Sequence, residues 1–332
     1  MYSAGNQLCP AWGLTLHGIR MQFQTPIHRA AVHHPIEQLL DVVETRMLES
    51  ISAHAPQAAR VSSPFACALD AASYHLSAGG QRIRAKLALH AALALGLTVS
   101  DAVSLATTVE LLHNASLVHD DIQDQDLVRR GRKSVWAHFG VNTAICTGDL
   151  LLSAAYAALC KLEQSHALAA MIGLIHERTA TAIDGQCADL TAHVHVAPDA
   201  ASAVARYQQI AVAKSGALLC LPIELALLAS REDRHLADAR RAVEAFAVGY
   251  QIVDDLNDVQ SDIGPDAASS TFNIVSICKA FSGSDAALAD AKQIGLHNLN
   301  TAIQSAMALP CGSGALLIDH ASGLRKLLVE QY

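Results

Sequence analysis

Leu111-Leu-His-Asn-Ala-Ser-Leu-Val-His-Asp-Asp-Ile-Gln-Asp124 is an apolar stretch that ends in three aspartates. On a helix, Asp120 and Asp124 lie one turn apart on one face, and Asp121 lies about 100° further round. Carboxylates gathered in this way repel one another, and they oppose the dipole at a helix C-terminus, which we expect at Gly131. Because a cation between the carboxylates removes the repulsion, the stretch predicts a cation site.

A second acidic cluster has the same spacing. Gln251-Ile-Val-Asp-Asp-Leu-Asn-Asp258 repeats the pattern Asp-Asp-x-x-Asp 134 residues later (254 − 120) and also follows an apolar run. One such triplet is common on a solvated helix face, but two that each close an apolar helix favour a metal site. Magnesium binds a few carboxylates together with phosphate oxygens and water. The pair therefore predicts magnesium shared with a polyanionic substrate.

Composition limits the class of protein. Of the 332 residues, 52% are hydrophobic and 16% are charged, which predicts a large core and not a disordered chain. The net charge of −8 argues against a general nucleic-acid binder. The eight cysteines form no Cys-x-x-Cys pair, which indicates reduced thiols in a cytoplasmic protein. We see no signal peptide and no apolar run long enough to span a bilayer.

Helical periodicity begins near Pro35 and continues along the chain, which is rich in alanine and leucine and lacks alternating strands. We predict a loose leader over residues 1–34 and one all-α domain, a helical bundle, over residues 35–332. Three helices that are apolar on nearly every side (85–97, 147–162 and 217–229) belong inside the bundle or against a partner subunit. Breaks are expected at residues 77–80, 96–98, 131, 140, 197–199, 230–233 and 264–266.

Two basic stretches are placed to bind phosphate. In Val128-Arg-Arg-Gly-Arg-Lys133, Arg129 follows Asp124 by five residues, although such a run is also typical of a solvated face. Ser77-Ala-Gly-Gly-Gln-Arg-Ile-Arg84 is a glycine turn before an apolar helix, and a helix N-terminus with arginines suits an anion. By itself this second stretch is equally consistent with a plain turn that carries exposed arginines.

Three residues inside apolar helices also need an explanation. His113 lies two turns before Asp120 and shares its face, although a lone buried histidine is usually structural. The segments Gly185-Gln-Cys-Ala-Asp-Leu190 and Lys214-Ser-Gly216 place an aspartate and a lysine among apolar residues. Such charges need partners, and a substrate phosphate or its metal ions are candidates.

Together, these motifs resemble the trans-isoprenyl diphosphate synthases (polyprenyl synthetases), in particular the geranylgeranyl-diphosphate-synthase-like members. The resemblance runs in order from Gly79 to Asp258 and includes G-G-x-R-x-R, H-x-x-x-L-x-H-D-D, R-R-G and both aspartate motifs. It implies an all-helical bundle of the isoprenoid synthase type around a central active-site cavity, usually in a homodimer. It also implies a Mg²⁺-dependent prenyltransferase that condenses isopentenyl diphosphate with an allylic diphosphate.

The resemblance carries residue roles with it. The implied magnesium ligands are Asp120, Asp121, Asp124, Asp254 and Asp258. The implied allylic site contains Arg129, Lys214 and Gln251, and the implied isopentenyl site contains Gln81, Arg84, His113 and Arg130. The departing diphosphate would be stabilised mainly by the magnesium that Asp120, Asp124 and Asp254 hold and by the charges of Arg129 and Lys214.

Two departures concern lysines. Gln81 stands where the family has a lysine in G-G-K-R-x-R-P, and we expect Arg82 to compensate in part. The segment 261–273 lacks both lysines of the family's G-K-x-x-G-x-D-x-x-x-G-K-x-T-L-P pattern. Each lost charge-assisted contact is worth roughly 1.5–3 kcal/mol, so isopentenyl affinity is affected more than fold or metal binding.

The residues before the first motif bear on product length. In this family a bulky aromatic there blocks the growing tail, and this chain has Ala115 and Ser116. We therefore expect a linear product of twenty carbons or more. Two alternatives stay open: a class I terpene cyclase or a prenyltransferase with another acceptor, and a non-catalytic partner subunit of a second synthase. The retained second aspartate motif argues against a cyclase, and Asp120, Asp124, Arg129 and Arg130 argue against a partner subunit.

Overall fold

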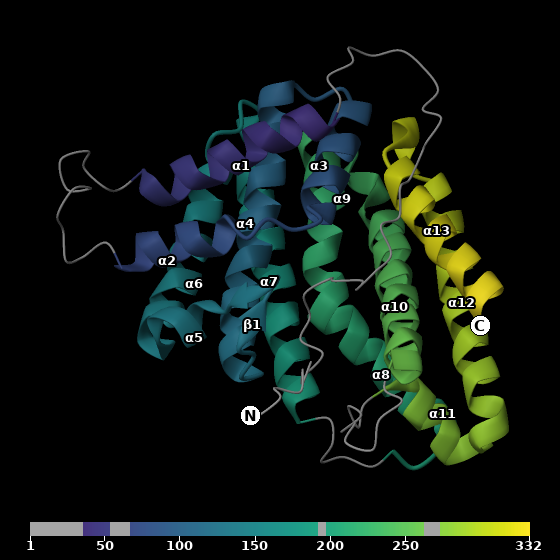
Figure 1. The fold of residues 1–332 in the computed structure, drawn as a ribbon. Coiled ribbons are helices and arrows are strands. Elements are labelled where there is room, and N and C mark those ends of the chain that lie inside the picture. Colours follow the sequence, from purple (N-terminus) through teal and green to yellow (C-terminus); the bar gives the residue numbers. More distant parts are fainter. Residues whose placement is uncertain (1–35, 54–66, 192–196, 262–272) are drawn as a thin grey trace.

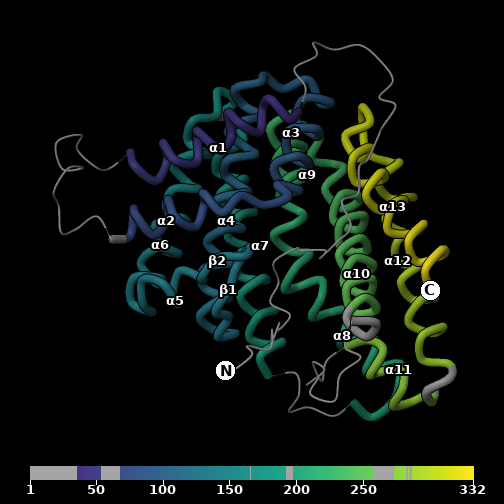
Figure 2. The backbone as a smooth tube through the Cα atoms, viewed as in Figure 1, coloured from purple at the N-terminus to yellow at the C-terminus, as the bar shows by residue number. Residues whose placement is uncertain are grey.

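The structure is a computed structural model that describes residues 36–53, 67–191, 197–261 and 273–332 (Figures 1 and 2). Within these ranges it is almost entirely helical, as predicted. The larger elements are α1 (Ile36–Ser52), α2 (Cys67–Leu76), α3 (Ile83–Ala94), α4 (Val99–Gln123), α5 (Val135–Phe139), α6 (Val141–Leu159), α7 (Leu168–Leu190), α8 (Ala200–Ala211), α9 (Ala217–Ala229), α10 (Leu236–Ser261), α11 (Ile274–Ser282), α12 (Ser284–Met307) and α13 (Ala315–Gln331). The short elements are the strands β1 (Val128–Arg129) and β2 (Arg132–Lys133), the 3₁₀ turns η2 (Ser165–Ala167), η5 (Asp233–His235) and η6 (Pro310–Gly312), and the π-helical turn η4 (Val212–Gly216).

Helix α9 lies at the centre of the bundle. Every one of its residues except Leu228 is buried, because its apolar side chains have α3, α4, α7 and α10 packed around them. Beyond it, α10, α12 and α13 pack side by side (Figure 1). The hydrophobic core is continuous and takes residues from α1 through α13. The single helical domain over residues 35–332 stays a prediction, and the predicted leader over residues 1–34 lies outside the described residues.

Helix α4, which carries the first aspartate motif, has defined caps at both ends. The hydroxyl of Thr98 accepts a hydrogen bond from the amide of Asp101 at its start (3.1 Å). At its end, Gln125 adopts a left-handed conformation (φ 58°), and the amide of Asp126 donates to the carbonyl of Asp121 (2.9 Å). This is the Schellman pattern. The expectation that this helix ends at Gly131 is therefore wrong, because the cap closes it at Gln123.

The basic run after α4 forms a hairpin. Strands β1 and β2 pair with Val128 opposite Lys133 and Arg129 opposite Arg132. The two turn residues, Arg130 and Gly131, both have positive φ (53° and 74°), which suits the two-residue turn of a right-twisted hairpin. Gly131 therefore turns a hairpin and does not end a helix.

The run Ala200–Ala229, which joins α8, η4 and α9, is long and apolar enough by length and composition to cross a membrane. The expectation that no such run exists is wrong on that criterion. However, 78% of its most apolar window is buried inside the protein, as is usual for the core helix of a bundle.

Candidate active site

Asp120 and Asp124, at the end of α4, lie close to polar side chains from two other elements, the ammonium of Lys214 in η4 and the amide of Gln186 on α7. Burial raises the pKa of Asp120 to about 7, the ammonium of Lys214 opposes that rise, and Asp124 adds to it. Burial likewise raises the pKa of Asp124, and Lys214 again opposes it. The amide of Gln186 on α7 donates to Oδ1 of Asp124 (3.3 Å). The structure therefore brings Lys214 close to the first motif and adds Gln186, for which no role was predicted. The role of Lys214 in the allylic site stays a prediction.

Asp121 and Arg129 form a buried ion pair. Asp121 has no exposed surface, and its Oδ1 accepts from Nε of Arg129 (2.8 Å) and from Nη2 of the same guanidinium. Nη2 of Arg129 also lies 3.4 Å from Oδ2 of Asp126. This pair fastens the hairpin to the end of α4. Asp121 and Arg129 were predicted to face metal and diphosphate, and here each has the other as its nearest opposite charge.

Lys214 and Asp189 also form an ion pair, with 2.5 Å between Nζ and Oδ2. Lys214 lies in η4, a π-helical turn, and such turns recur at functional sites. Gly185 on α7 makes room for it, since a Cβ there would lie 2.3 Å from the backbone nitrogen of Lys214. Each of these two charges thus has the other as a partner, and their contact with substrate or metal stays a prediction.

Arg84, His113 and Arg130 form a cluster of nitrogen-rich side chains next to the first motif. Burial lowers the pKa of Arg84 to about 10, although Glu110, Tyr250 and Asp120 oppose it. Burial, followed by the charges of Arg84 and Arg130, holds the pKa of His113 well below its usual value, so its imidazole is neutral. Nε of Arg84 is buried and has no hydrogen-bond partner among the described residues. Such a cluster suits an anion.

Arg130 reaches across to the glycine turn before α3. Its Nη1 donates to the carbonyl of Gly79 and lies 3.5 Å from Oδ1 of Asn114. A Cβ at Gly80 would lie 3.0 Å from Cζ of Arg130, so a larger residue there would push this guanidinium from its place. Arg130 thus accounts for the glycine at position 80, whereas Gly79, with φ of 71° and no atom within 4 Å of a built Cβ, is favoured by its left-handed backbone.

His75 and Asn114 support this arrangement, and neither was predicted from the sequence. Nε2 of His75 is 3.1 Å from Oδ1 of Asn114, whose Nδ2 donates to the carbonyl of Glu110 (2.7 Å). An amide oxygen only accepts, so Nε2 of His75 carries the proton. Burial, followed by the charges of Arg130 and Arg129, lowers the pKa of His75 to about 3. No sequence signal marks these residues, because their contact joins α2 to α4.

The neighbouring side chains Gln81 and Arg82 behave differently. Gln81 is exposed. Arg82 is buried, and its Nε donates to Glu44 (3.0 Å) while its Nη1 lies 3.5 Å from Glu110. The expectation that Arg82 compensates for the missing lysine is not supported, since its charge is taken up by these two glutamates.

The second motif lies near the end of α10. Burial raises the pKa of Tyr250, and the charge of Asp254 adds to that rise. Tyr250 and Asp120 in turn both raise the pKa of Arg84 against the effect of its burial. Oδ1 of Asp255 accepts from Nε2 of Gln251 (2.8 Å). Gln251, which was predicted for the allylic site, thus donates to a motif carboxylate. Asp258 belongs to α10, but its side chain lies outside what the structure describes, as does the lysine-poor segment 262–272.

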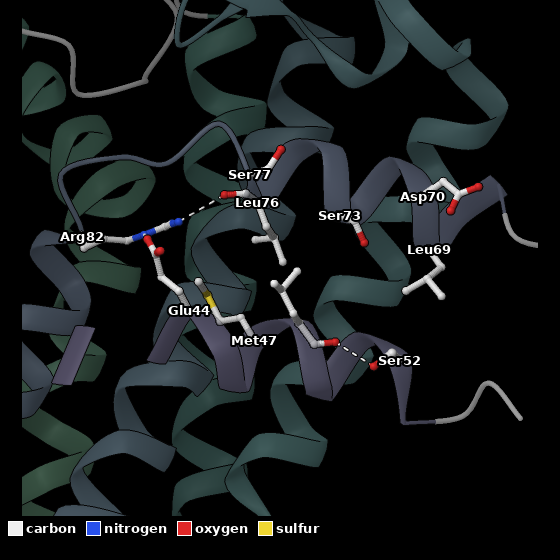
Figure 3. Close-up of a pocket in the computed structure, with 10 residues that line it drawn as sticks. Glu44, Met47, Ser52, Leu69, Asp70, Ser73, Leu76, Ser77 and Arg82 are labelled. Atoms are coloured by element: carbon white, nitrogen blue, oxygen red, sulfur yellow. Dashed lines mark hydrogen bonds and ion pairs between the residues drawn. The ribbon is translucent and has the colours of Figure 1, made fainter. Parts of the chain in front are cut away.

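A cavity of about 540 Å³ lies between α1 and α2 (Figure 3). Its walls come from Met47, Leu48, Leu69 and Leu76, with Glu44, Asp70 and Arg82 at its polar parts. None of the predicted site residues lines it. The cavity therefore does not correspond to the central active-site cavity that the resemblance implies.

Among the described residues, no three His, Cys, Asp or Glu side chains lie close enough to hold a metal ion by themselves. Magnesium does not require such a cage, since it commonly takes one or two carboxylates and completes its shell with phosphate oxygens and water. Asp120 and Asp124 offer that minimal set, because burial and their mutual repulsion disfavour ionisation unless a cation is near. The residues present therefore fit magnesium bound together with a diphosphate.

An all-helical core, with acidic motifs near the ends of two helices and an arginine–histidine cluster beside one of them, is characteristic of the isoprenoid synthase class. The chain belongs to the polyprenyl synthetase family, whose sequence profile matches residues 66–277.

Three proteins illustrate the range of named activities among proteins that are similar to this chain. The short chain isoprenyl diphosphate synthase of Methanothermobacter thermautotrophicus is 28% identical over 225 residues, which are 67% of this chain and 65% of that protein. The all-trans-nonaprenyl-diphosphate synthase (geranyl-diphosphate specific) of Rhodobacter capsulatus is 32% identical over 203 residues, 61% of this chain and 60% of that protein. The geranylgeranyl pyrophosphate synthetase structure from Geoglobus acetivorans shares the fold (TM-score 0.70, 23% identity, 88% of this chain and 99% of that one). The aligned part thus spans less than two-thirds of each of the two sequence relatives.

Proposed function

We propose that this protein is a Mg²⁺-dependent trans-isoprenyl diphosphate synthase that condenses isopentenyl diphosphate with an allylic diphosphate. The observation that carries the proposal is the arrangement around Asp120. Lys214 lies near Asp120 and Asp124, whereas Arg84 lies near Asp120 and His113, and its buried Nε has no hydrogen-bond partner among the described residues. The first motif thus has a cation from η4 and an anion-binding cluster built from α3, α4 and the hairpin, which suits two diphosphates held next to each other.

Magnesium fits the site at the first aspartate motif, where the allylic diphosphate is proposed to bind. Asp120 and Asp124, and by the resemblance Asp254 and Asp258, would hold it together with the allylic diphosphate. When bound, the metal ions draw electron density from the diphosphate and make it a better leaving group.

The chain's own residues have separate tasks in the reaction. Lys214 stabilises the negative charge that grows on the allylic diphosphate oxygen while the bond from that oxygen to C1 breaks. Arg84 and Arg130 hold isopentenyl diphosphate, and neutral His113 is free to donate a hydrogen bond to it. The isopentenyl double bond then forms the new carbon–carbon bond at C1. A proton leaves the adjacent carbon, for which the released pyrophosphate is the nearest strong base, and the double bond is restored.

Arg129 supports this site in a different way from the one predicted. Because its guanidinium pairs with Asp121, it holds the hairpin against the end of α4, and Arg130 follows it in the hairpin turn. Contact between Arg129 and the allylic diphosphate remains part of the proposal.

We further propose a product of twenty carbons or more. Ala115 is buried in the hydrophobic core five residues before Asp120, and its methyl group is smaller than the aromatic ring that, by the resemblance, would block a growing chain. Similar proteins carry names from short-chain to nonaprenyl synthases, so relatives do not fix the length.

A second candidate is prenyl transfer to another acceptor. Gln81 is exposed, and Arg82 is taken up by Glu44 and Glu110, so the isopentenyl side has less positive charge than the resemblance implies. If this candidate holds, the protein consumes allylic diphosphate without incorporating isopentenyl diphosphate.

We also propose a cytoplasmic homodimer. Six cysteines within the described ranges are free thiols, which supports a reducing compartment. The exposed apolar residues Val141 and Ile145 on α6 and Ile172 and Ile183 on α7 support a partner face. Light scattering coupled to size exclusion tests the dimer, and a monomer mass at micromolar concentration contradicts it.

The function is tested by Asp120→Asn, which keeps the size of the side chain and removes its charge. We expect pyrophosphate release from allylic diphosphate to fall about 10²–10³-fold, as is common when one group that stabilises the transition state is lost. Asp149→Asn, on the exposed face of α6, is the control and should retain full activity. Equal activity of Asp120→Asn and the parent contradicts the assignment.

A further inference from the structure

Asp255, the second aspartate of the second motif, has both of its oxygens occupied by donors from the protein. Oδ1 accepts from Gln251, and Oδ2 accepts from the hydroxyl of Tyr207 (2.8 Å) and the backbone amide of Ile274 (2.8 Å). Asp255 is 6% exposed and Tyr207 is 2% exposed. Three donors in a buried setting fill most of the acceptor positions of a carboxylate, so Asp255 has little left for a metal ion.

The contacts of Asp255 join three helices. Tyr207 comes from α8, Asp255 from α10, and Ile274 is the first residue of α11. Asn273 strengthens the junction, because its Nδ2 donates to the carbonyl of Asp255 (3.2 Å) and its Oδ1 caps α11 by accepting from Val275 (2.8 Å). A carboxylate at a helix N-terminus is also favoured by the helix dipole.

The same junction joins the two segments that carry Lys214 and Asp254, which the proposed function places at the magnesium-bound allylic diphosphate. Asp254 precedes Asp255, so the rotation of α10 that keeps Asp255 on Tyr207 also sets the direction in which Asp254 projects. Tyr207 lies seven residues before Lys214 on the continuous run of α8 and η4. The hydroxyl–carboxylate bond therefore ties the segment that carries Lys214 to the helix that carries Asp254.

We propose that Tyr207 and Asp255 are positioning residues, which hold Lys214 and Asp254 at the separation that a magnesium-bound diphosphate requires. This inference rests on the proposed function of the site. Asp255 thereby differs from Asp254: it fixes the helix and does not coordinate the metal. Asp121, whose Oδ1 is taken up by Arg129, has the matching position in the first motif.

The test is Tyr207→Phe, which removes one oxygen and keeps the buried ring. Binding of inorganic pyrophosphate in the presence of Mg²⁺ is measured by isothermal calorimetry, which needs no turnover. Since a hydrogen bond to a charged group is worth about 1.5–3 kcal/mol, we expect the dissociation constant to rise by about tenfold or more. In steady-state kinetics, KM for the allylic substrate should rise, whereas KM for isopentenyl diphosphate should stay within twofold.

Tyr332→Phe is the matched control. The hydroxyl of Tyr332 donates to Oδ1 of Asn257 on α10 (2.5 Å). This variant therefore also removes a hydrogen bond from a tyrosine hydroxyl to α10, but it leaves the motif carboxylates untouched. We expect its affinity for pyrophosphate to match that of the parent. Asp255→Asn is a second variant, which replaces one carboxylate oxygen by an amide NH₂ group that cannot accept a hydrogen bond from the donors around Asp255. It should weaken pyrophosphate binding at least as much as Tyr207→Phe.

The outcomes separate the inference from the proposed function. If the parent binds pyrophosphate with Mg²⁺ and folded Tyr207→Phe and Asp255→Asn bind it equally well, the positioning role is wrong while the proposed function stands. The positioning role is also wrong if Tyr332→Phe loses as much affinity as Tyr207→Phe. If the parent itself binds no pyrophosphate with Mg²⁺, the proposed function fails first.

Discussion

The guanidinium of Arg130 occupies the space that a side chain at Gly80 would take. It donates to the carbonyl of Gly79, and a Cβ built on Gly80 would lie 3.0 Å from its Cζ. The hairpin after α4 and the glycine turn before α3 are 51 residues apart in the chain, and this contact joins them. If Arg130 binds isopentenyl diphosphate, the turn determines where it does so.

Gly80→Ala should therefore displace Arg130. We expect KM for isopentenyl diphosphate to rise by about tenfold, because one charge-assisted contact is worth roughly 1.5–3 kcal/mol, while KM for the allylic substrate stays unchanged. Gly79→Ala is the control. Gly79 also has positive φ (71°), but no atom lies within 4 Å of a Cβ at that position. Equal isopentenyl KM values in the two variants would show that backbone strain, and not Arg130, causes the effect.

The charge of Lys214 beside the first motif leads to a prediction about catalysis. Lys214→Met keeps the length of the side chain and removes its charge next to Asp120 and Asp124. We expect kcat to fall about 10²-fold, because the charge stabilises the departing diphosphate, whereas KM for isopentenyl diphosphate changes little. Lys161→Met, at an exposed position, serves as the control. Single-turnover kinetics check the result, and an unchanged chemical step in Lys214→Met rules out the proposed role.

The buried His75 predicts a loss of stability in acid. Burial lowers its folded-state pKa from 6.5 to about 3, so protons bind preferentially to the unfolded chain. The stabilising contribution is present above pH 6.5 and is lost as the pH falls from there towards 3. This single site should cost about 2 kcal/mol between pH 7 and pH 5.

His75→Gln keeps a donor for Asn114 but does not titrate. Urea unfolding at pH 7 and pH 5 should therefore show a smaller acid loss in this variant than in the parent, by about 2 kcal/mol. His166→Gln, at an exposed histidine, should show the parent's full loss. If His75→Gln loses as much stability as His166→Gln, then His75 is not the residue responsible.

Ala115 carries the prediction of product length. Ala115→Val and Ala115→Phe add volume in steps, and we expect the main product to become shorter at each step. Overpacking a buried site typically costs about 1–3 kcal/mol, so thermal unfolding should confirm that both variants are folded at the assay temperature. An unchanged length distribution from a folded Ala115→Phe protein would place the end of the chain tunnel elsewhere.

The fold was predictable because its signals are local. Long apolar periodicity indicates the helices, and the stretch 217–229, apolar on nearly every side, indicates the buried position of α9. The end of α4 was not predictable in the same way. Glycine is the usual residue in the left-handed position after a helix, so the sequence favours an end at Gly131, whereas the structure has Gln125 in that position.

The site residues were only partly predictable, for a different reason. Spacing along one helix brings Asp120 and Asp124 together, so the motif can be recognised in sequence. The partners that fix the site come from other elements: Asp189 for Lys214, Arg129 for Asp121, and Tyr207 for Asp255. A pairing of this kind depends on how the elements pack, and nothing in either local sequence marks it.

The measurement that tests the central claim most directly is a product assay. Purified protein, Mg²⁺ and labelled isopentenyl diphosphate are combined with dimethylallyl, geranyl or farnesyl diphosphate, and the products are sized after phosphatase treatment. We predict linear isoprenyl alcohols of twenty or more carbons and no incorporation when Mg²⁺ is chelated. A protein that releases no pyrophosphate from any of the three allylic substrates would contradict the proposed function.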